Sequence, residues 1–193
     1  MSSKTAQPKR PAVFLDRDGT LNREVDVLRH LKQLRVLPGV PEAVRALNRA
    51  GYMTIVVTNQ AVIGRGWLTE AGLGEIHDVL RMRLAREGAR IDALYYCPHH
   101  PNANLKKYRA VCVCRKPGIG MIRQAAKAHN IDLKKSFLVG DHTRDILTGK
   151  RAGLTTVLVK TGYGGKDGHY DIKADYTARD LREAVKFIRK HDA

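Results

Sequence analysis

The sequence contains no long hydrophobic run and few aromatic or cysteine residues. No apolar stretch among its 193 residues approaches the length of a membrane span, and the polar first 11 residues contain no signal-peptide core. Internal repeats, low-complexity tracts and an obvious linker are also absent. We therefore expect residues 1–11 to form a flexible tail and residues 12–193 to form a single domain. A monomer in the cytoplasm is the default expectation.

Acidic residues are scarce relative to basic ones. The chain has 35 Lys and Arg against 19 Asp and Glu, a net charge of +16, and a pI near 10.1. Such a surface attracts polyanions. The basic residues are dispersed, however, and only 6% of residues are aromatic, so no basic stripe with interleaved aromatics exists. The charge is weak support for an anionic partner. Nucleic acid is not expected, although the net charge leaves it open.

All three cysteines of the chain lie close to one histidine in the sequence, as Cys97, His99, Cys112 and Cys114, with 12 residues between the two pairs. Three thiolates and one imidazole form a standard closed tetrahedral zinc set. A disulfide between Cys112 and Cys114 is sterically poor, and a cytosolic setting disfavours it. The spacing therefore predicts a structural zinc in a loop over residues 97–114. His100 is a competing ligand.

Strand-like and helix-like segments alternate along the chain. Short apolar or β-branched runs predict strands over residues 13–15, 53–57, 93–96, 137–139 and 156–159. Helical spacing predicts helices over residues 41–50, between Thr69 and Gly88, and over 121–129, 145–152 and 181–189. This alternation is typical of an α/β protein with a parallel sheet that is covered by helices on both faces.

The most informative segment is Asp16-Arg17-Asp18-Gly19-Thr20, which directly follows the first predicted strand. Two carboxylates one residue apart at the carboxyl end of a strand repel each other unless a cation lies between them. Mg²⁺ prefers such oxygen ligands and commonly bridges them to substrate phosphate. A solvated acidic turn is the plain alternative. Because Thr58, Lys116 and Asp141 also follow strands or lie in loops, we expect one shared site at this edge.

Four segments, taken in order, resemble the signature motifs of the haloacid dehalogenase superfamily: Asp16-Arg17-Asp18-Gly19-Thr20, Thr58-Asn59-Gln60, Arg115-Lys116-Pro117 and Gly140-Asp141-His142-Thr143-Arg144-Asp145. Together with the cysteine–histidine set they resemble its zinc-containing branch, which includes heptose bisphosphate and histidinol-phosphate phosphatases. The length of the zinc loop is closer to the heptose type. The resemblance implies a Rossmann-like sheet and hydrolysis of the 7-phosphate of D-glycero-D-manno-heptose 1,7-bisphosphate. No large insertion makes room for a cap domain, so we expect an open site.

The resemblance also implies a role for each motif residue. Asp16 is the expected nucleophile, which forms an aspartyl phosphate, and Asp18 the acid and then base. Thr58 and the Asn59 backbone N–H hold phosphoryl oxygens, and Lys116 neutralises their charge. The expected Mg²⁺ ligands are Asp16, the Asp18 backbone carbonyl and Asp141. Asp145 is expected to orient the site. A phosphorylated sugar is the expected substrate.

Substrate recognition is expected from two segments and one arginine: Glu24, Val25, Asp26 and Val27, then Asn59, Gln60 and Ala61, and finally Arg115. Arg65 and His142 are left without a role, although His142 replaces a common lysine and thereby removes a fixed positive charge. Three alternatives remain open: a histidinol-phosphate phosphatase, a polynucleotide 3′-phosphatase, and a zinc-bearing nucleic-acid binding module without enzymatic activity.

Overall fold

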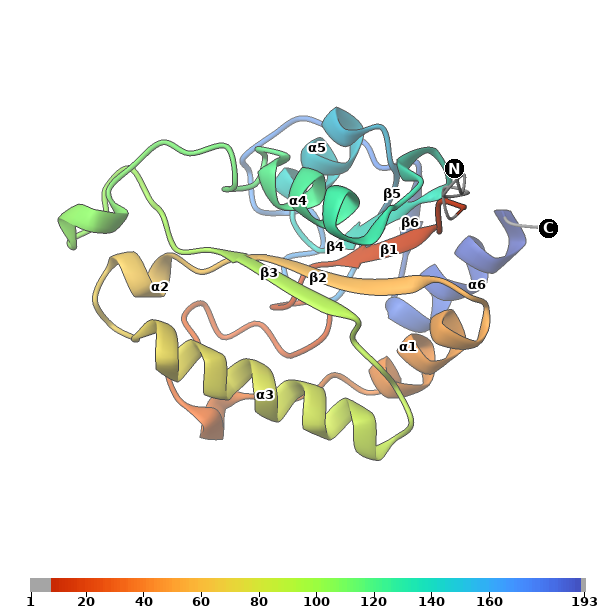
Figure 1. The fold of residues 1–193 in the computed structure, drawn as a ribbon, viewed down its shortest axis with the longest axis horizontal. Coiled ribbons are helices and arrows are strands. Elements are labelled where there is room, and N and C mark those ends of the chain that lie inside the picture. The colour runs from red at the N-terminus through yellow and green to blue at the C-terminus, as the bar shows by residue number, and fades with distance from the viewer. Residues whose placement is uncertain (1–7, 192–193) are drawn as a thin grey trace, which may run out of the picture.

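The computed structural model describes residues 8–191, which form one six-stranded parallel sheet with the order β3-β2-β1-β4-β5-β6 (Figure 1). The strands are β1 (Ala12–Leu15), β2 (Met53–Asn59), β3 (Ala93–Cys97), β4 (Phe137–Gly140), β5 (Thr155–Val159) and β6 (Tyr176–Ala178). The two central strands are buried at every position. A parallel sheet that is covered on both faces requires such continuous apolar runs.

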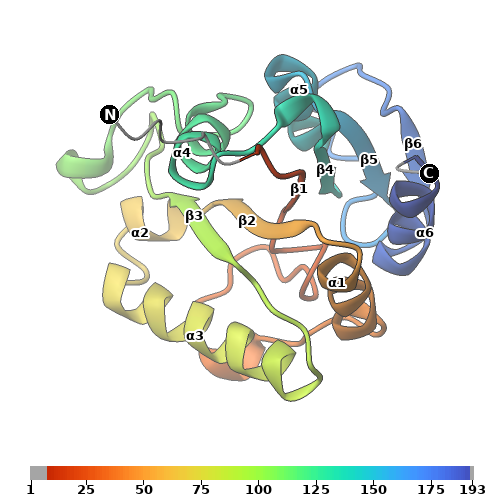
Figure 2. The ribbon, with the colours of Figure 1, turned by 45° about the vertical axis from the view of Figure 1, so that its right-hand side comes forward.

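Helices cover both faces of this sheet. They are α1 (Val40–Arg49), α2 (Ala61–Gly64), α3 (Glu70–Arg86), α4 (Gly120–His129), α5 (Thr143–Ala152) and α6 (Leu181–His191), with 3₁₀ turns at Leu31–Gln33, Lys106–Tyr108 and Leu133–Lys135. In Figures 1 and 2, α1, α3 and α6 lie on one face of the sheet and α4 and α5 on the other. The alternation of the sequence therefore predicted the architecture correctly.

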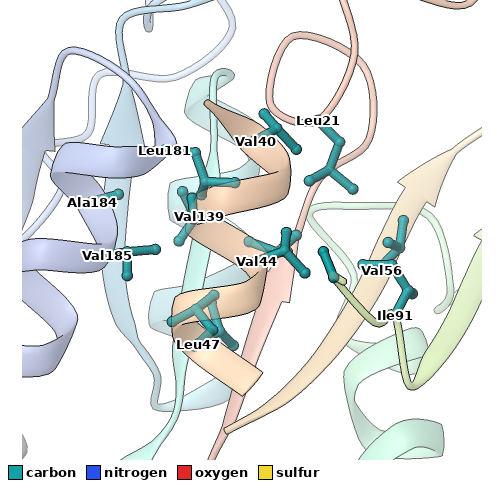
Figure 3. Close-up of a cluster of buried hydrophobic side chains, with 14 of the residues drawn as sticks. Leu21, Val40, Val44, Leu47, Val56, Ile91, Val139, Leu181, Ala184 and Val185 are labelled. Atoms are coloured by element: carbon teal, nitrogen blue, oxygen red, sulfur yellow. The ribbon is translucent and has the colours of Figure 1, made fainter. Parts of the chain in front are cut away.

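The larger part of the core lies between the sheet and the face that carries α1 and α6 (Figure 3). Val40, Val44 and Leu47 recur at helical spacing along α1 and are fully buried. They pack against Val139 of β4 and Leu181 of α6, among others. A second cluster fills the opposite face under α4. These two layers hold the strands, and therefore the strand ends, in fixed positions.

The order of the strands reverses direction at β1. The chain runs outward from β1 through β2 to β3, and then returns to place β4 on the other side of β1. In open parallel sheets, ligands bind at the carboxyl ends of the strands next to such a reversal. Asp16 follows β1 and Asp141 follows β4, so the fold brings these two carboxylates to one place.

Several short elements were not predicted. The three-residue strand β6 and the four-residue helix α2 are too short to show a period in the sequence. Most of the expected tail, residues 1–7, lies outside the described residues. Within its remainder, the Arg10 N–H donates to Asn130 O over 3.1 Å and Arg10 O accepts from the Asp132 N–H over 2.9 Å. Among the described residues, no helix is long and apolar enough to cross a membrane.

Candidate active site

A buried lysine links two carboxylates at the carboxyl ends of the central strands. Lys116 Nζ lies 2.9 Å from Asp16 Oδ1 and 2.7 Å from Asp145 Oδ1, and it donates to Val57 O over 3.0 Å. Burial opposes the charge on Lys116, but Asp145 and Asp16 outweigh it and raise the pKa of the ammonium. Burial raises the pKa of Asp16, which Lys116 counteracts. Because burial disfavours the ionised form of Asp16, a further cation beside this carboxylate would stabilise it.

The position of Lys116 is set by the second strand. The Asn59 side chain exchanges two hydrogen bonds with the Lys116 backbone: Nδ2 donates to the carbonyl over 3.1 Å and Oδ1 accepts from the N–H over 3.0 Å. Asn59 lies at the end of β2, so the loop that carries Lys116 is tied directly to the sheet. The sequence did not indicate this use of the Asn59 amide.

Two glycines make room for the Asp141 carboxylate. A Cβ at Gly19 would lie 2.2 Å from Asp141 Oδ2, and one at Gly162 would lie 2.1 Å from it. Both glycines also have a positive φ, +76° and +59°. Asp141 Oδ2 accepts from the Tyr163 N–H over 2.8 Å, and Asp141 Oδ1 lies 3.0 Å from His142 Nδ1. The backbone therefore fits closely around this carboxylate.

Four side chains at this edge could hold a metal ion together. The ligand atoms of Asp16, Asp141, His142 and Asp145 lie within 4.8 Å of one another, and all four residues are buried. Carboxylate oxygens suit a hard cation such as Mg²⁺, and Lys116 balances only part of their negative charge. The Asp18 side chain is not in this group, and the Asp18 contribution expected from the sequence is its backbone carbonyl.

The Asp18 carboxylate is held by three neighbouring side chains. Arg17 donates to both of its oxygens, Asn22 Nδ2 donates to Oδ1 over 2.9 Å, and Gln60 Nε2 donates to Oδ2 over 2.9 Å. Burial would raise the pKa of Asp18, but the Arg17 charge and these hydrogen bonds outweigh it and lower that pKa. Asp18 is therefore a carboxylate in this arrangement.

Most of the residues expected at the site line one pocket of about 220 Å³. They are Asp16, Asp18, Glu24, Asp26, Val27, Thr58, Asn59, Gln60, Ala61, Arg115 and Lys116. Val25 and Asp141 do not line it: the Val25 side chain packs against the main core, and Asp141 is fully buried beneath the pocket surface. Gln60 differs in its contacts: its amide also donates to Thr58 Oγ1 over 2.9 Å and accepts from Arg17 Nη2 over 3.0 Å. Both ends of Gln60 are thus engaged within the protein.

Three arginines line the same pocket without a carboxylate partner. Within residues 8–191, Arg65, Arg115 and Arg144 form no ion pair with an acidic side chain. Burial lowers the pKa of Arg115, and the charges of Arg144 and Arg65 lower it further, as expected of neighbouring cations. Arg144 lies in the first turn of α5, within a motif that the sequence pointed to but without an assigned role.

An acidic segment lies on another side of the pocket. Burial, together with the charges of Asp18 and Asp141, raises the pKa of Glu24 to about 7. Asp26 Oδ1 accepts from the Tyr163 hydroxyl over 2.9 Å, which links this segment to the loop after β5. The Tyr163 ring packs on His142 with centroids 4.4 Å apart. Sequence reasoning missed Tyr163, because nothing in its local pattern distinguishes it from a loop residue.

The cysteines and His99 form a second cluster beside the pocket. The three Sγ–Sγ distances are 3.4 Å for Cys97 and Cys112, 3.0 Å for Cys112 and Cys114, and 3.1 Å for Cys114 and Cys97. His99 Nδ1 lies 3.5 Å from Cys114 Sγ. Burial and the neighbouring sulfurs raise the pKa of Cys97, so a bound cation would favour its thiolate form. This donor set fits zinc.

The other expected zinc-loop contacts are now placed. His100 is outside the cluster, and its Nδ1 accepts from the Asn102 N–H over 3.0 Å. Ala103 and Tyr108 are buried against Val62 and Ile63 of α2, which gives the loop a small core of its own. This segment extends beyond β3 beside α2 (Figure 1). Arg115 Nη1 donates to His99 O over 3.2 Å, so the cluster adjoins the arginine side of the pocket.

A parallel sheet that delivers Asp16, Thr58, Lys116 and Asp141 to one edge, in that order along the chain, defines a haloacid dehalogenase-like hydrolase. The family model described as HAD-hydrolase-like matches residues 113–184. A Rhodopseudomonas palustris D-glycero-β-D-manno-heptose-1,7-bisphosphate 7-phosphatase is 42% identical over 147 residues, which cover 76% of this chain and 82% of that protein.

Two further comparisons cover nearly the whole chain. A Thermosynechococcus vestitus D-glycero-D-manno-heptose-1,7-bisphosphate 7-phosphatase is 40% identical, with 94% of this chain and 97% of that protein covered. The crystal structure of a D,D-heptose 1,7-bisphosphate phosphatase from B. bronchiseptica, complexed with magnesium and phosphate, has a TM-score of 0.83 at 31% identity and covers 94% of this chain and 99% of that chain. This chain therefore belongs to the heptose bisphosphate phosphatase family of haloacid dehalogenase-like hydrolases, and it is a phosphatase.

Proposed function

We propose that this protein removes the 7-phosphate of D-glycero-D-manno-heptose 1,7-bisphosphate. The observation that carries the proposal is the distribution of charge in the pocket. Carboxylates and Lys116 meet at the strand ends, whereas Arg65, Arg115 and Arg144 bring guanidinium groups without a carboxylate partner from other segments. A substrate with two phosphates matches both parts, since Arg binds a phosphate through two N–H groups. The names of the relatives supply the sugar.

The reacting phosphate belongs beside Asp16 in this proposal. Asp16 forms a bond to phosphorus while the bond from phosphorus to the sugar oxygen breaks, which leaves an aspartyl phosphate. Thr58 and Lys116 stabilise the charge on the phosphoryl oxygens. Asp18, a carboxylate in the substrate-free arrangement, takes up a proton from solvent as the negatively charged substrate binds and gives it to the departing sugar oxygen. It later takes a proton from the water that attacks the aspartyl phosphate. Inorganic phosphate leaves and Asp16 is regenerated.

Asp16, Asp141 and the Asp18 carbonyl would hold Mg²⁺ at this site. When bound, the ion supplies positive charge that lets a carboxylate approach a negatively charged phosphate. Asp145 does not touch phosphate in this scheme and orients Lys116, from which it is 2.7 Å away. Burial favours the neutral form of Asp16, so a neighbouring cation also keeps the nucleophile ionised.

We assign a structural role to zinc at Cys97, His99, Cys112 and Cys114. The four donors leave no coordination position for substrate, as is usual of structural sites. Through the hydrogen bond from Arg115 to His99 O, an ordered loop would hold Arg115 toward the pocket. Lys106, Lys107 and Arg109 of this loop do not line the pocket, and Arg109 Nε donates to Ala103 O over 2.8 Å. They have no part in the proposal.

The proposal is tested by comparing kcat/KM for four substrates: heptose 1,7-bisphosphate, heptose 7-phosphate, histidinol phosphate and a 3′-phosphorylated oligonucleotide. We expect the bisphosphate to be preferred. Arg144→Ala and Arg115→Ala should each lower kcat/KM for the bisphosphate by about 10- to 100-fold, with a smaller loss for the 7-phosphate. Lys127→Ala, an exposed position on α4, is the control for loss of one positive charge. Preference for histidinol phosphate or the oligonucleotide would contradict the proposal.

A further inference from the structure

A fully buried arginine lies between the two aspartates of the first motif, and the mechanism above gives it no task. Arg17 Nε donates to Asp18 Oδ1 over 3.1 Å, and Nη2 donates to Asp18 Oδ1 and Oδ2 over 3.0 and 2.7 Å. Nη2 also donates to Gln60 Oε1 over 3.0 Å, and Nη1 lies 3.1 Å from His77 Nε2. The guanidinium thus joins Asp18 to β2 and to α3.

His77 completes this arrangement from a helix remote in sequence. It is buried in α3, 60 positions after Arg17. Burial and the neighbouring Arg17 charge lower the pKa of His77 to about 3, so the imidazole is neutral and Nε2 accepts the hydrogen bond from Nη1. Without His77, the Nη1 group of the buried Arg17 guanidinium would lose this acceptor. A buried N–H group that is left unpaired costs free energy.

The Arg17 guanidinium acts on Asp18 through its geometry as well as its charge. Because Arg presents a planar fork, its contacts fix the direction of both Asp18 oxygens. An Arg side chain has many rotamers, however, and its far end must be anchored to hold one of them. His77 and Gln60 provide the two anchors. A misplacement of about 1 Å of a reacting group costs about 100-fold in rate, so this anchoring bears directly on proton transfer.

We propose that Arg17 and His77 are positioning residues for the proton transfer at Asp18, with His77 holding Arg17 and Arg17 holding the carboxylate. The inference rests on the proposed function only through the role of Asp18 and does not depend on the identity of the sugar. It predicts a dependence on the leaving group. An alcohol needs a proton as it leaves phosphorus, whereas p-nitrophenolate leaves without one.

The experiment measures kcat/KM for an alkyl and an aryl phosphate. This constant covers the steps up to cleavage of the ester, so the later attack of water does not enter it. The substrates are heptose 1,7-bisphosphate and p-nitrophenyl phosphate, with glycerol 3-phosphate as a second alkyl ester. The variants are His77→Phe, which fills the site without an acceptor, His77→Gln, which restores one, and Arg17→Lys, which keeps the charge without the fork. Asp78→Asn, exposed on the same helix, is the matched control.

We expect His77→Phe and Arg17→Lys to lower kcat/KM for the alkyl esters by about 10- to 100-fold and for p-nitrophenyl phosphate by no more than about 2-fold. His77→Gln should recover most of the loss. Equal losses on both ester types, or no loss on either, would overturn the inference. If His77→Phe does not fold, as judged by its thermal transition, the Gln and Lys variants still decide the matter. A wild-type protein that cleaves glycerol 3-phosphate but not heptose bisphosphate would refute the proposed substrate and leave this test intact.

Discussion

The two groups of side chains that could hold a cation differ in how the protein supports them. Asp16 and Asp141 follow neighbouring central strands, and the Lys116 ammonium already balances part of their charge. The sulfur cluster instead lies at the two ends of a loop, and no lysine or arginine side chain donates to its sulfurs among the hydrogen bonds of residues 8–191. The carboxylate site is therefore built by the sheet, whereas the sulfur site would depend on a bound ion.

The largest expected effect comes from removing the nucleophile on the carboxylate side. Asp16→Asn should lower kcat by at least about 10⁴-fold, because an amide cannot form the aspartyl phosphate and Asp18 cannot replace Asp16 as nucleophile. Release of inorganic phosphate measures this loss. The sulfur cluster should keep its zinc, which metal analysis of the same preparation would check. Turnover near the wild-type level would contradict the assignment of Asp16.

The carboxylate site and the sulfur cluster should respond differently when each metal is removed separately. Dialysis into magnesium-free buffer should abolish activity, which added Mg²⁺ restores, and leave the protease resistance of residues 98–111 unchanged. Cys97→Ser should instead release zinc, expose this segment to proteases and lower Tm by about 10 °C, which corresponds to a loss of about 3 kcal/mol. Limited proteolysis with mass analysis locates the cleavage. Cleavage spread evenly over the chain would contradict this, because it would show that the whole domain and not this segment alone depends on the sulfur site.

A smaller change should disturb the carboxylate site through the backbone. In Gly162→Ala the new methyl would meet Asp141 Oδ2, so we expect Mg²⁺ affinity to fall by about 10- to 100-fold. Gly51→Ala is the matched control, since its φ is +85° but nothing lies within 4 Å of the added Cβ. Both substitutions place an alanine at a positive φ, which costs about 1 kcal/mol of stability, and only Gly162→Ala should lose metal affinity. Titration of activity with Mg²⁺ gives the affinity.

The smallest expected effect concerns surplus negative charge on the carboxylate side. The pKa of Glu24 is raised to about 7, well above its value in an unfolded chain. A raised pKa adds stability at low pH that is lost as the pH rises toward 7. Glu24→Gln should therefore stabilise the metal-free protein at pH 8 by about 1 kcal/mol, after allowance for partial exposure, and change little at pH 4. Thermal unfolding at both pH values measures this. Equal stabilisation at the two pH values would contradict it.

The sequence predicted much of the fold and the candidate site, for a physical reason. Each long strand is a short apolar run, and parallel strands end at the same edge, so the polar residues after them had to meet. Contacts that depend on side-chain direction were beyond reach. Gln60 turns inward to Arg17, Val25 turns into the core, and Arg144 reaches the pocket from α5. None of these directions follows from local pattern, because each is chosen by packing against distant segments.

Two hydrogen bonds join the Asn59 side chain to the Lys116 backbone. Because of them, the position of Lys116 does not depend on the length of the chain that precedes it. Asn59 ties the Lys116 backbone to the sheet as a neighbouring strand would, so the position of the Lys116 ammonium is set by β2 and not by the intervening segment. The segment between Pro98 and Val111, none of whose residues lines the pocket, can then change in length while Lys116 keeps its place. Insertions and deletions are therefore better tolerated there than in the strands that carry the carboxylates.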